Sequence, residues 1–204
     1  MKKHMRRTIV AIPFVITIVA LTVALSGAAY GELVDNGGGL IYDTDLNITW
    51  YVPDVAPTTW SEAVSWAAGL SVSNEKVSNV TGWRLPSIVN EDGTGPCSSY
   101  NCVRSEFGHL YYVELGNAPG GPIANKGPFS NLKDGVYWSA LQWDPYPGNA
   151  WAFNLYTGRQ GFADKNLCAN FYPMAVHDGN VGGSVRSVKR DRHVHVRGAS
   201  LGSR

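Results

Sequence analysis

Basic residues are scarce in the middle of this chain. Between residues 32 and 182, seven lysines and arginines stand against fifteen aspartates and glutamates, which gives a net charge of −8. Such an acidic segment is a poor ligand for nucleic acid or for any other polyanion, so we exclude those partners for it. All charged residues together make up only 16% of the 204 residues, whereas glycine, tryptophan and tyrosine are abundant. This composition indicates a compact, loop-rich fold rather than a helical bundle or a disordered chain.

The sequence also lacks residues at the spacing of a catalytic or metal site. His109 has no evident nucleophile or carboxylate partner, which favours a structural role over catalysis. Asp43, Asp45 and Asn47 have the spacing that opens an EF-hand calcium loop. That loop requires glycine where Ile48 stands, and the flanking residues favour strands, so a plain turn is the preferred interpretation and calcium the alternative. We predict a protein that is not an enzyme and that has no metal and no cofactor.

Both ends of the chain differ in composition from its middle. Residues 1–31 contain four basic residues, an apolar run over 8–25 and then small residues, as in a secretory signal peptide cleaved before Glu32. An uncleaved anchor is the alternative, because the run approaches the length that spans a bilayer. Residues 184–204 form a basic tail with no core pattern, which we expect to be disordered. We therefore predict one domain over 32–183 that is extracytoplasmic (secreted, periplasmic or at the cell surface) and has no stable membrane span after cleavage.

Hydrophobic periodicity predicts two helices and several strands. The first helix begins after Thr59, which forms a capping box with Glu62, and it leaves Trp66 half-exposed. The second helix covers 105–115 and turns Phe107, Leu110, Tyr111 and Leu115 inward. Strands are expected in a hairpin over 40–51, at 135–140, at 149–156 and directly after the turn at 157–162, with a closing strand over 170–176 that His177, Asp178 and Gly179 end.

The segment 81–87 is the predicted centre of the domain. It is expected to form a short strand with Trp83 and Leu85 on one face and Arg84 on the other. Pro86 should end this strand, because proline cannot donate to a sheet ladder, and Ser87 should cap a following helical turn.

Two of the three cysteines lie close together. In an oxidising compartment, Cys97 and Cys102 most simply form a local disulfide that pins a surface loop. This pairing leaves Cys168 without a partner in the sequence, so we expect it to be either a buried free thiol or an intermolecular link.

Several motifs resemble those of a known family. Gly82-Trp83-Arg84-Leu85-Pro86, Tyr137-Trp138-Ser139 and Asn149-Ala150-Trp151-Ala152-Phe153 are similar to signatures of the Legionella collagen-like protein C-terminal domain family, a domain of unknown function. The motifs at 105–110, 127–131 and 175–179 resemble an exported bacterial subgroup that carries a Pro-Glu-Pro tag handled by an exosortase. No such tag follows Val185, and we expect it to be absent or lost to a frameshift.

This resemblance implies a C-type-lectin-like α+β fold: a small twisted antiparallel sheet with two helices and long loops. It also implies a noncatalytic adhesion module that binds carbohydrate or extracellular matrix. The family's binding of sulfated glycans is not transferred, because an acidic domain lacks the basic surface for it. Alternatives are a structural matrix protein and a cysteine-dependent enzyme on the related fold of the formylglycine-generating enzyme. As ligand-binding residues we predict Trp143, Asp144, Tyr146 and Asn149, since sugar sites combine aromatic and polar groups; packing within a Trp-rich fold is the alternative for these aromatics.

Overall fold

The computed structural model describes residues 31–167 and 169–183, which form an α+β fold. The predicted fold class is confirmed, but the prediction of one small antiparallel sheet is wrong. The described part of the chain contains two four-stranded sheets, and one of them includes a parallel pair of strands. Residues 1–30, Cys168 and 184–204 lie outside the described residues, so the predicted signal peptide, third cysteine and basic tail are not described. No helix in residues 31–167 or 169–183 is long and apolar enough to cross a membrane.

The first sheet is antiparallel throughout and has the order β1-β2-β3-β8. Its strands are β1 (Leu33–Gly37), β2 (Leu40–Asp43), β3 (Ile48–Tyr51) and β8 (Ala175–Asp178). The predicted hairpin is therefore confirmed, with β2 paired to β3. In its turn, the Asp43 carboxylate accepts hydrogen bonds from the backbone N–H groups of Asp45 and Leu46, at 3.2 and 3.0 Å. Asn47 adopts a positive φ of 52°, a conformation that asparagine tolerates well.

The second sheet has the order β6-β5-β4-β7. Its strands are β4 (Val136–Gln142), β5 (Asn149–Asn154), β6 (Arg159–Asp164) and β7 (Phe171–Tyr172). The strands predicted at 135–140 and 149–156 are confirmed as β4 and β5, whereas β6 begins at Arg159, inside the segment 157–162 that was expected to be a turn. β7 runs parallel to β4, whereas the other pairs are antiparallel.

The predicted closing strand over 170–176 is wrong, because the chain changes sheets within it. β7 belongs to the second sheet and β8 to the first, and Pro173 and Met174 connect them. Proline has no N–H to donate, so the ladder is interrupted there. His177 and Asp178, expected to end the strand, instead pair with Thr49 and Ile48 of β3.

Helix α1 (Trp60–Gly69) begins where the sequence predicts. The Glu62 carboxylate accepts the backbone N–H of Thr59 at 3.0 Å, and the hydroxyls of Thr58 and Thr59 donate to the same oxygen at 2.7 Å. Ala63 and Ala67 are buried, and Trp66 is half-buried as expected.

The second helix is less regular than predicted. It consists of α2 (Glu106–Gly108) followed by the π-helix η1 (His109–Glu114). At its end, the backbone N–H of Leu115 donates to the carbonyl of Leu110, a hydrogen bond over five residues rather than four. The predicted inward residues Phe107, Leu110, Tyr111 and Leu115 are all buried.

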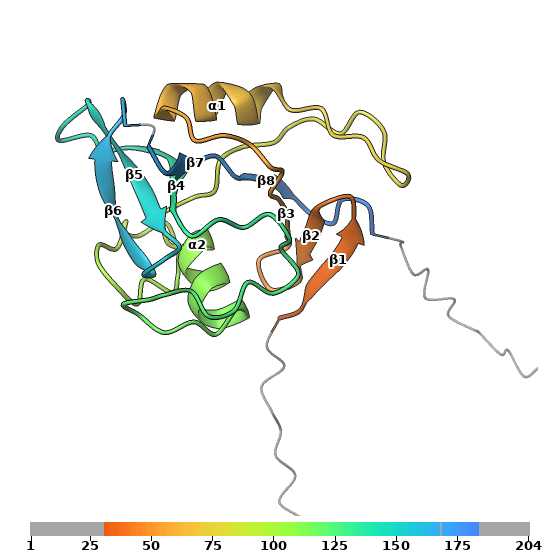
Figure 1. The fold of residues 1–204 in the computed structure, drawn as a ribbon, viewed down its shortest axis with the longest axis horizontal. Helices are drawn as coiled ribbons and strands as arrows, with labels where there is room; N and C mark the ends of the chain where they lie inside the picture. Colours follow the sequence, from red (N-terminus) through yellow and green to blue (C-terminus); the bar gives the residue numbers. More distant parts are fainter. Residues whose placement is uncertain (1–30, 168, 184–204) are drawn as a thin grey trace, which may run out of the picture.

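The strands lie between two apolar clusters. One cluster gathers residues of α2 and η1 with the side chains of Trp50, Trp151 and Phe153. The other combines Ala63 and Ala67 of α1 with the small residues on the opposite face of β5. Figure 1 shows this arrangement, with α1 on one side of the strands and α2 on the other. β5 is therefore buried on both faces, which explains why alanines alternate with its aromatic residues.

The segment 81–87 joins the first sheet only at one point. Arg84 exchanges two backbone hydrogen bonds with Val176, at 3.0 and 2.8 Å. These bonds form an isolated bridge, so the short strand predicted for this segment is absent from the described structure. Trp83 and Leu85 are buried, as expected, and Arg84 points to the other side. The Ser87 hydroxyl accepts the backbone N–H of Val89, as a helix cap would, but no helical turn follows. The backbone N–H of Ser87 donates to the Glu106 carboxylate.

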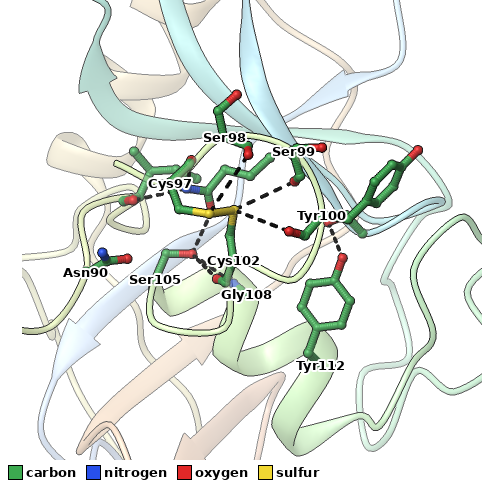
Figure 2. The surroundings of a disulfide bond; sticks show 12 residues. Asn90, Cys97, Ser98, Ser99, Tyr100, Cys102, Ser105, Gly108 and Tyr112 are labelled. Atoms are coloured by element: carbon green, nitrogen blue, oxygen red, sulfur yellow. Dashed lines mark hydrogen bonds between the residues drawn. A yellow bond between two sulfur atoms is a disulfide. The ribbon is translucent and has the colours of Figure 1, made fainter. Parts of the chain in front are cut away.

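Cys97 and Cys102 form the predicted disulfide (Figure 2). The loop they close lies at the surface, as expected, because residues 98–101 are exposed and only Cys102 is buried. The loop exchanges two backbone hydrogen bonds between Ser99 and Gln160 of β6, both 2.8 Å long. The buried Gln160 amide donates to the carbonyl of Cys97 at 2.7 Å and accepts the hydroxyl of Ser105 at 2.7 Å. The disulfide loop, β6 and the start of α2 therefore meet at one buried glutamine.

Candidate binding surface

The predicted ligand-binding residues lie in the turn between β4 and β5. Three backbone hydrogen bonds close this turn: Trp143 donates to Asn149, Asn149 donates to Tyr146, and Tyr146 donates to Trp143. Their lengths are 2.8–3.0 Å. The turn is therefore held by its own backbone, and its side chains are free for other contacts.

Three aromatic side chains gather at this turn, and we call Trp143, Tyr146 and Phe162 the aromatic cluster. The ring centroids of Trp143 and Tyr146 lie 4.8 Å apart, and Phe162 of β6 stacks on Trp143 at 3.5 Å with an interplanar angle of 19°. Tyr146 is 62% exposed and Phe162 is 46% exposed, whereas Trp143 is half-buried. The surface that a ligand meets is therefore made chiefly of Tyr146 and Phe162, supported by Trp143.

Phe162 was not predicted as a site residue. It pairs with Trp151 across β5 and β6, and the two rings meet edge to face at 5.8 Å. Trp151 is buried beside it. To predict this contact, the register between the Trp151 strand and the following strand would have to be known. No local sequence pattern determines that register.

Asp144 and Asn149 belong to the same turn as the two predicted aromatics. Asp144 is exposed and Asn149 is half-buried. Among the residues that the structure describes, neither side chain forms a hydrogen bond with another group. Their oxygen and nitrogen atoms are therefore available to a ligand. Of the four predicted residues, Trp143 and Tyr146 are the two whose side chains are in contact with each other.

No family model matches the chain. A comparison with models of protein families and a search of curated proteins both end without a match. The resemblance to the Legionella collagen-like protein C-terminal domain family therefore remains a prediction from the motifs.

The tryptophans of those motifs are structural in the fold. Trp83, Trp138 and Trp151 are buried. The indole N–H of Trp83 donates to the carbonyl of Val80, and that of Trp138 donates to the carbonyl of Thr58, each at 2.9 Å. A buried indole needs such a partner, so both tryptophans are fixed by the surrounding loops.

A shallow groove of about 130 Å³ lies next to the aromatic cluster. Its lining includes Phe162, but its other apolar residues belong to the sheet face that packs with α1, and they include Val136 of β4 and Phe171 of β7. Pockets that enclose a drug-sized ligand have volumes of about 300–1,000 Å³. The groove is too small for that, so a ligand here would lie on the surface.

The prediction for His109 is wrong in one respect. The residue was expected to have no carboxylate partner, yet its Nε2 atom lies 3.2 Å from Oε1 of Glu114 and 3.6 Å from Oδ2 of Asp45. The partner was missed because an ideal α-helix would separate positions 109 and 114 by about 140° around its axis.

Proposed function

We propose that residues 32–183 form an exported, noncatalytic binding module and that the aromatic cluster holds an extracellular glycan. The observation that carries the proposal is the exposure of Tyr146 and Phe162 on a common support. Both rings contact Trp143 or its turn, and both keep about half or more of their surface in water. Exposed aromatic rings in fixed positions provide the flat apolar faces on which sugar rings pack.

The charge of the domain narrows the ligand to neutral glycans. Residues 32–182 carry a net charge of −8, so a sulfated or carboxylated glycan would be repelled. A neutral sugar is not repelled by the negative electrostatic potential of the domain, and it can use Asp144 and Asn149 as hydrogen-bonding partners. Binding of such a ligand should depend little on ionic strength.

Catalysis by Cys97 or Cys102 is disfavoured. Catalysis by cysteine requires a free thiolate. Cys97 and Cys102 are joined in a disulfide, and this leaves no free thiol in residues 31–167 and 169–183. A structural role in an extracellular matrix is the remaining alternative, and the experiment below separates it from glycan binding.

The test is a glycan array probed with the full chain, secreted from an oxidising host, at about 50 and 500 mM salt. We expect binding to neutral glycans at both salt concentrations. Tyr146→Ala and Phe162→Ala should each weaken it by about tenfold, the usual effect of truncating an aromatic residue at the centre of a contact. Tyr156→Ala is the matched control, because Tyr156 is a similarly exposed aromatic outside the cluster.

Three results would contradict the proposal. Equal losses in the control would place the ligand elsewhere. Binding that disappears at high salt would indicate electrostatic contact with a basic segment. The absence of binding to any glycan would favour the structural alternative.

A further inference from the structure

A buried group of acidic residues and one histidine lies where the β2–β3 turn meets the π-helix. One ligand atom each from Asp43, His109 and Glu114 can be chosen so that all three lie within 4.8 Å of one another. Asp43 is fully buried, and the side chains of Glu114 and His109 are 3% and 13% exposed. Asp45, 39% exposed, stands at the rim with its Oδ2 atom 3.6 Å from Nε2 of His109.

The π-helix is what brings two of these side chains together. His109 and Glu114 are the first and last residues of η1. Five residues correspond to about 140° more than one full turn in an α-helix, so the two side chains would diverge. The wider π turn returns them to one face, where they are in contact. Such π turns frequently coincide with functional sites.

The negative charge of the group is incompletely compensated. Both oxygens of Asp43 already accept hydrogen bonds, from two turn amides and from the indole of Trp50. Glu114 differs: its Oε1 atom contacts His109, and its Oε2 atom accepts no hydrogen bond from any residue in the described part of the chain. Burial, and next the charge of Asp43, raise the pKa of Glu114. This open oxygen is not sealed from solvent, so a cation can reach it and would neutralise the charge of a largely buried carboxylate.

We propose that Asp43, His109 and Glu114 bind a divalent transition-metal ion, with Asp45 at the open side as a fourth ligand. Zinc accepts imidazole nitrogen and carboxylate oxygen together, whereas calcium and magnesium prefer oxygen ligands alone. The ion would link the β2–β3 turn to η1, two segments that are far apart in the sequence. The site is separate from the aromatic cluster, so the inference does not depend on glycan binding.

The probe is zinc added to the full chain after treatment with EDTA and removal of the chelator. We expect a saturable rise of the melting temperature, about 5–10 °C at a zinc concentration one hundred times Kd. Metal analysis after desalting should give about one zinc per chain.

Matched variants locate the site. Glu114→Gln and His109→Gln should abolish the zinc-dependent shift, whereas Glu75→Gln and His177→Gln, at positions outside the group, should retain it. The shift is measured within each variant, with and without zinc, so that a loss of intrinsic stability is not mistaken for a loss of metal. His193→Ala combined with His195→Ala removes the other closely spaced histidines of the chain.

Each remaining outcome overturns the inference. A melting temperature that zinc does not change means that the group is a structural ion pair, with Glu114 neutralised by His109 or by a proton. A shift that survives in Glu114→Gln and His109→Gln, or that vanishes in the tail variant, means that zinc binds elsewhere.

Discussion

Arg84 and Glu106 form a two-pronged ion pair that joins the segment 81–87 to helix α2. Nη1 of Arg84 donates to Oε2 of Glu106 at 2.9 Å, and Nη2 donates to Oε1 at 2.7 Å. The backbone N–H of Ser87 donates to the same carboxylate at 2.6 Å, and Asp178 of β8 accepts a further bond from Arg84 at 3.1 Å. Three segments distant in the sequence are thus held by one guanidinium and one carboxylate.

Replacement of Glu106 by alanine should destabilise the fold by about 1–3 kcal/mol. The Glu106 side chain is largely buried, so its loss leaves Arg84 and the Ser87 amide without their strongest acceptor, although partial exposure of Arg84 limits the effect. Urea unfolding measures this change. Arg104→Ala is the control, because it breaks only the exposed pair with Asp92 and should cost less than about 1 kcal/mol. Equal losses of unfolding free energy in the two variants would show that the Arg84–Glu106 pair stabilises the fold no more than an exposed ion pair does.

Two helical glycines should respond in opposite ways to alanine. A β-carbon at Gly108 would lie 1.7 Å from the carbonyl oxygen of Cys102, so the disulfide loop would have to move, at a cost of about 3 kcal/mol. A β-carbon at Gly69, at the end of α1, would meet no atom within 4 Å. Gly69→Ala should therefore be neutral or stabilise by up to about 1 kcal/mol. Thermal unfolding of the two variants tests this, and similar melting temperatures for both would contradict the close contact at Gly108.

Replacement of the buried Gln160 by methionine should cost about 2–4 kcal/mol. Methionine has a similar volume but cannot replace the bonds to Cys97, Ile88 and Ser105, so several buried polar groups lose their partner. Urea unfolding gives the loss of stability, and limited proteolysis should show earlier cleavage within 97–102. Gln142→Met, at a half-exposed position of β4, is the control and should cost less, because it removes only the partly buried hydrogen bond from Lys165. Unchanged proteolysis in Gln160→Met would mean that the disulfide and the backbone bonds to Ser99 hold the loop without the Gln160 side chain.

The capping box of α1 should make stability fall in acid. Hydrogen bonds from the Thr58 and Thr59 hydroxyls, and from the Thr59 amide, lower the pKa of Glu62 from 4.5 to about 2. A carboxyl whose pKa is lower in the folded state stabilises the fold above its unfolded pKa, and this contribution disappears as the pH falls from about 4.5 towards 2. The melting temperature of Glu62→Gln should therefore lie below that of the native chain at pH 6 and approach it near pH 2. A difference that does not depend on pH would exclude the ionised capping box as its cause.

Local signals in the sequence were sufficient for most of the secondary structure. The capping box located the start of α1, and alternation located β5, because hydrogen bonding and burial act there over a few residues. The division of the strands into two sheets could not be predicted, since it depends on which distant strands pair. The same holds for the split at Pro173, where a local signal existed but its consequence depended on β3 and β4 as partners.

The candidate sites show the same limit. Trp143 and Tyr146 are three residues apart, so a single turn was enough to predict their association. Phe162 joins them only through the register of β5 and β6. His109 and Glu114 were not associated because the helical period used for the prediction is wrong for a π-helix.

The passage of the chain from β7 to β8 makes both sheets depend on the end of the domain. β7 supplies the last strand of one sheet and β8 that of the other, although only Pro173 and Met174 separate them. Until these residues are available, β3 and β4 each keep an open edge. A ribosome or a secretion channel delivers the amino-terminal part first, so the domain can close only after release of residue 178.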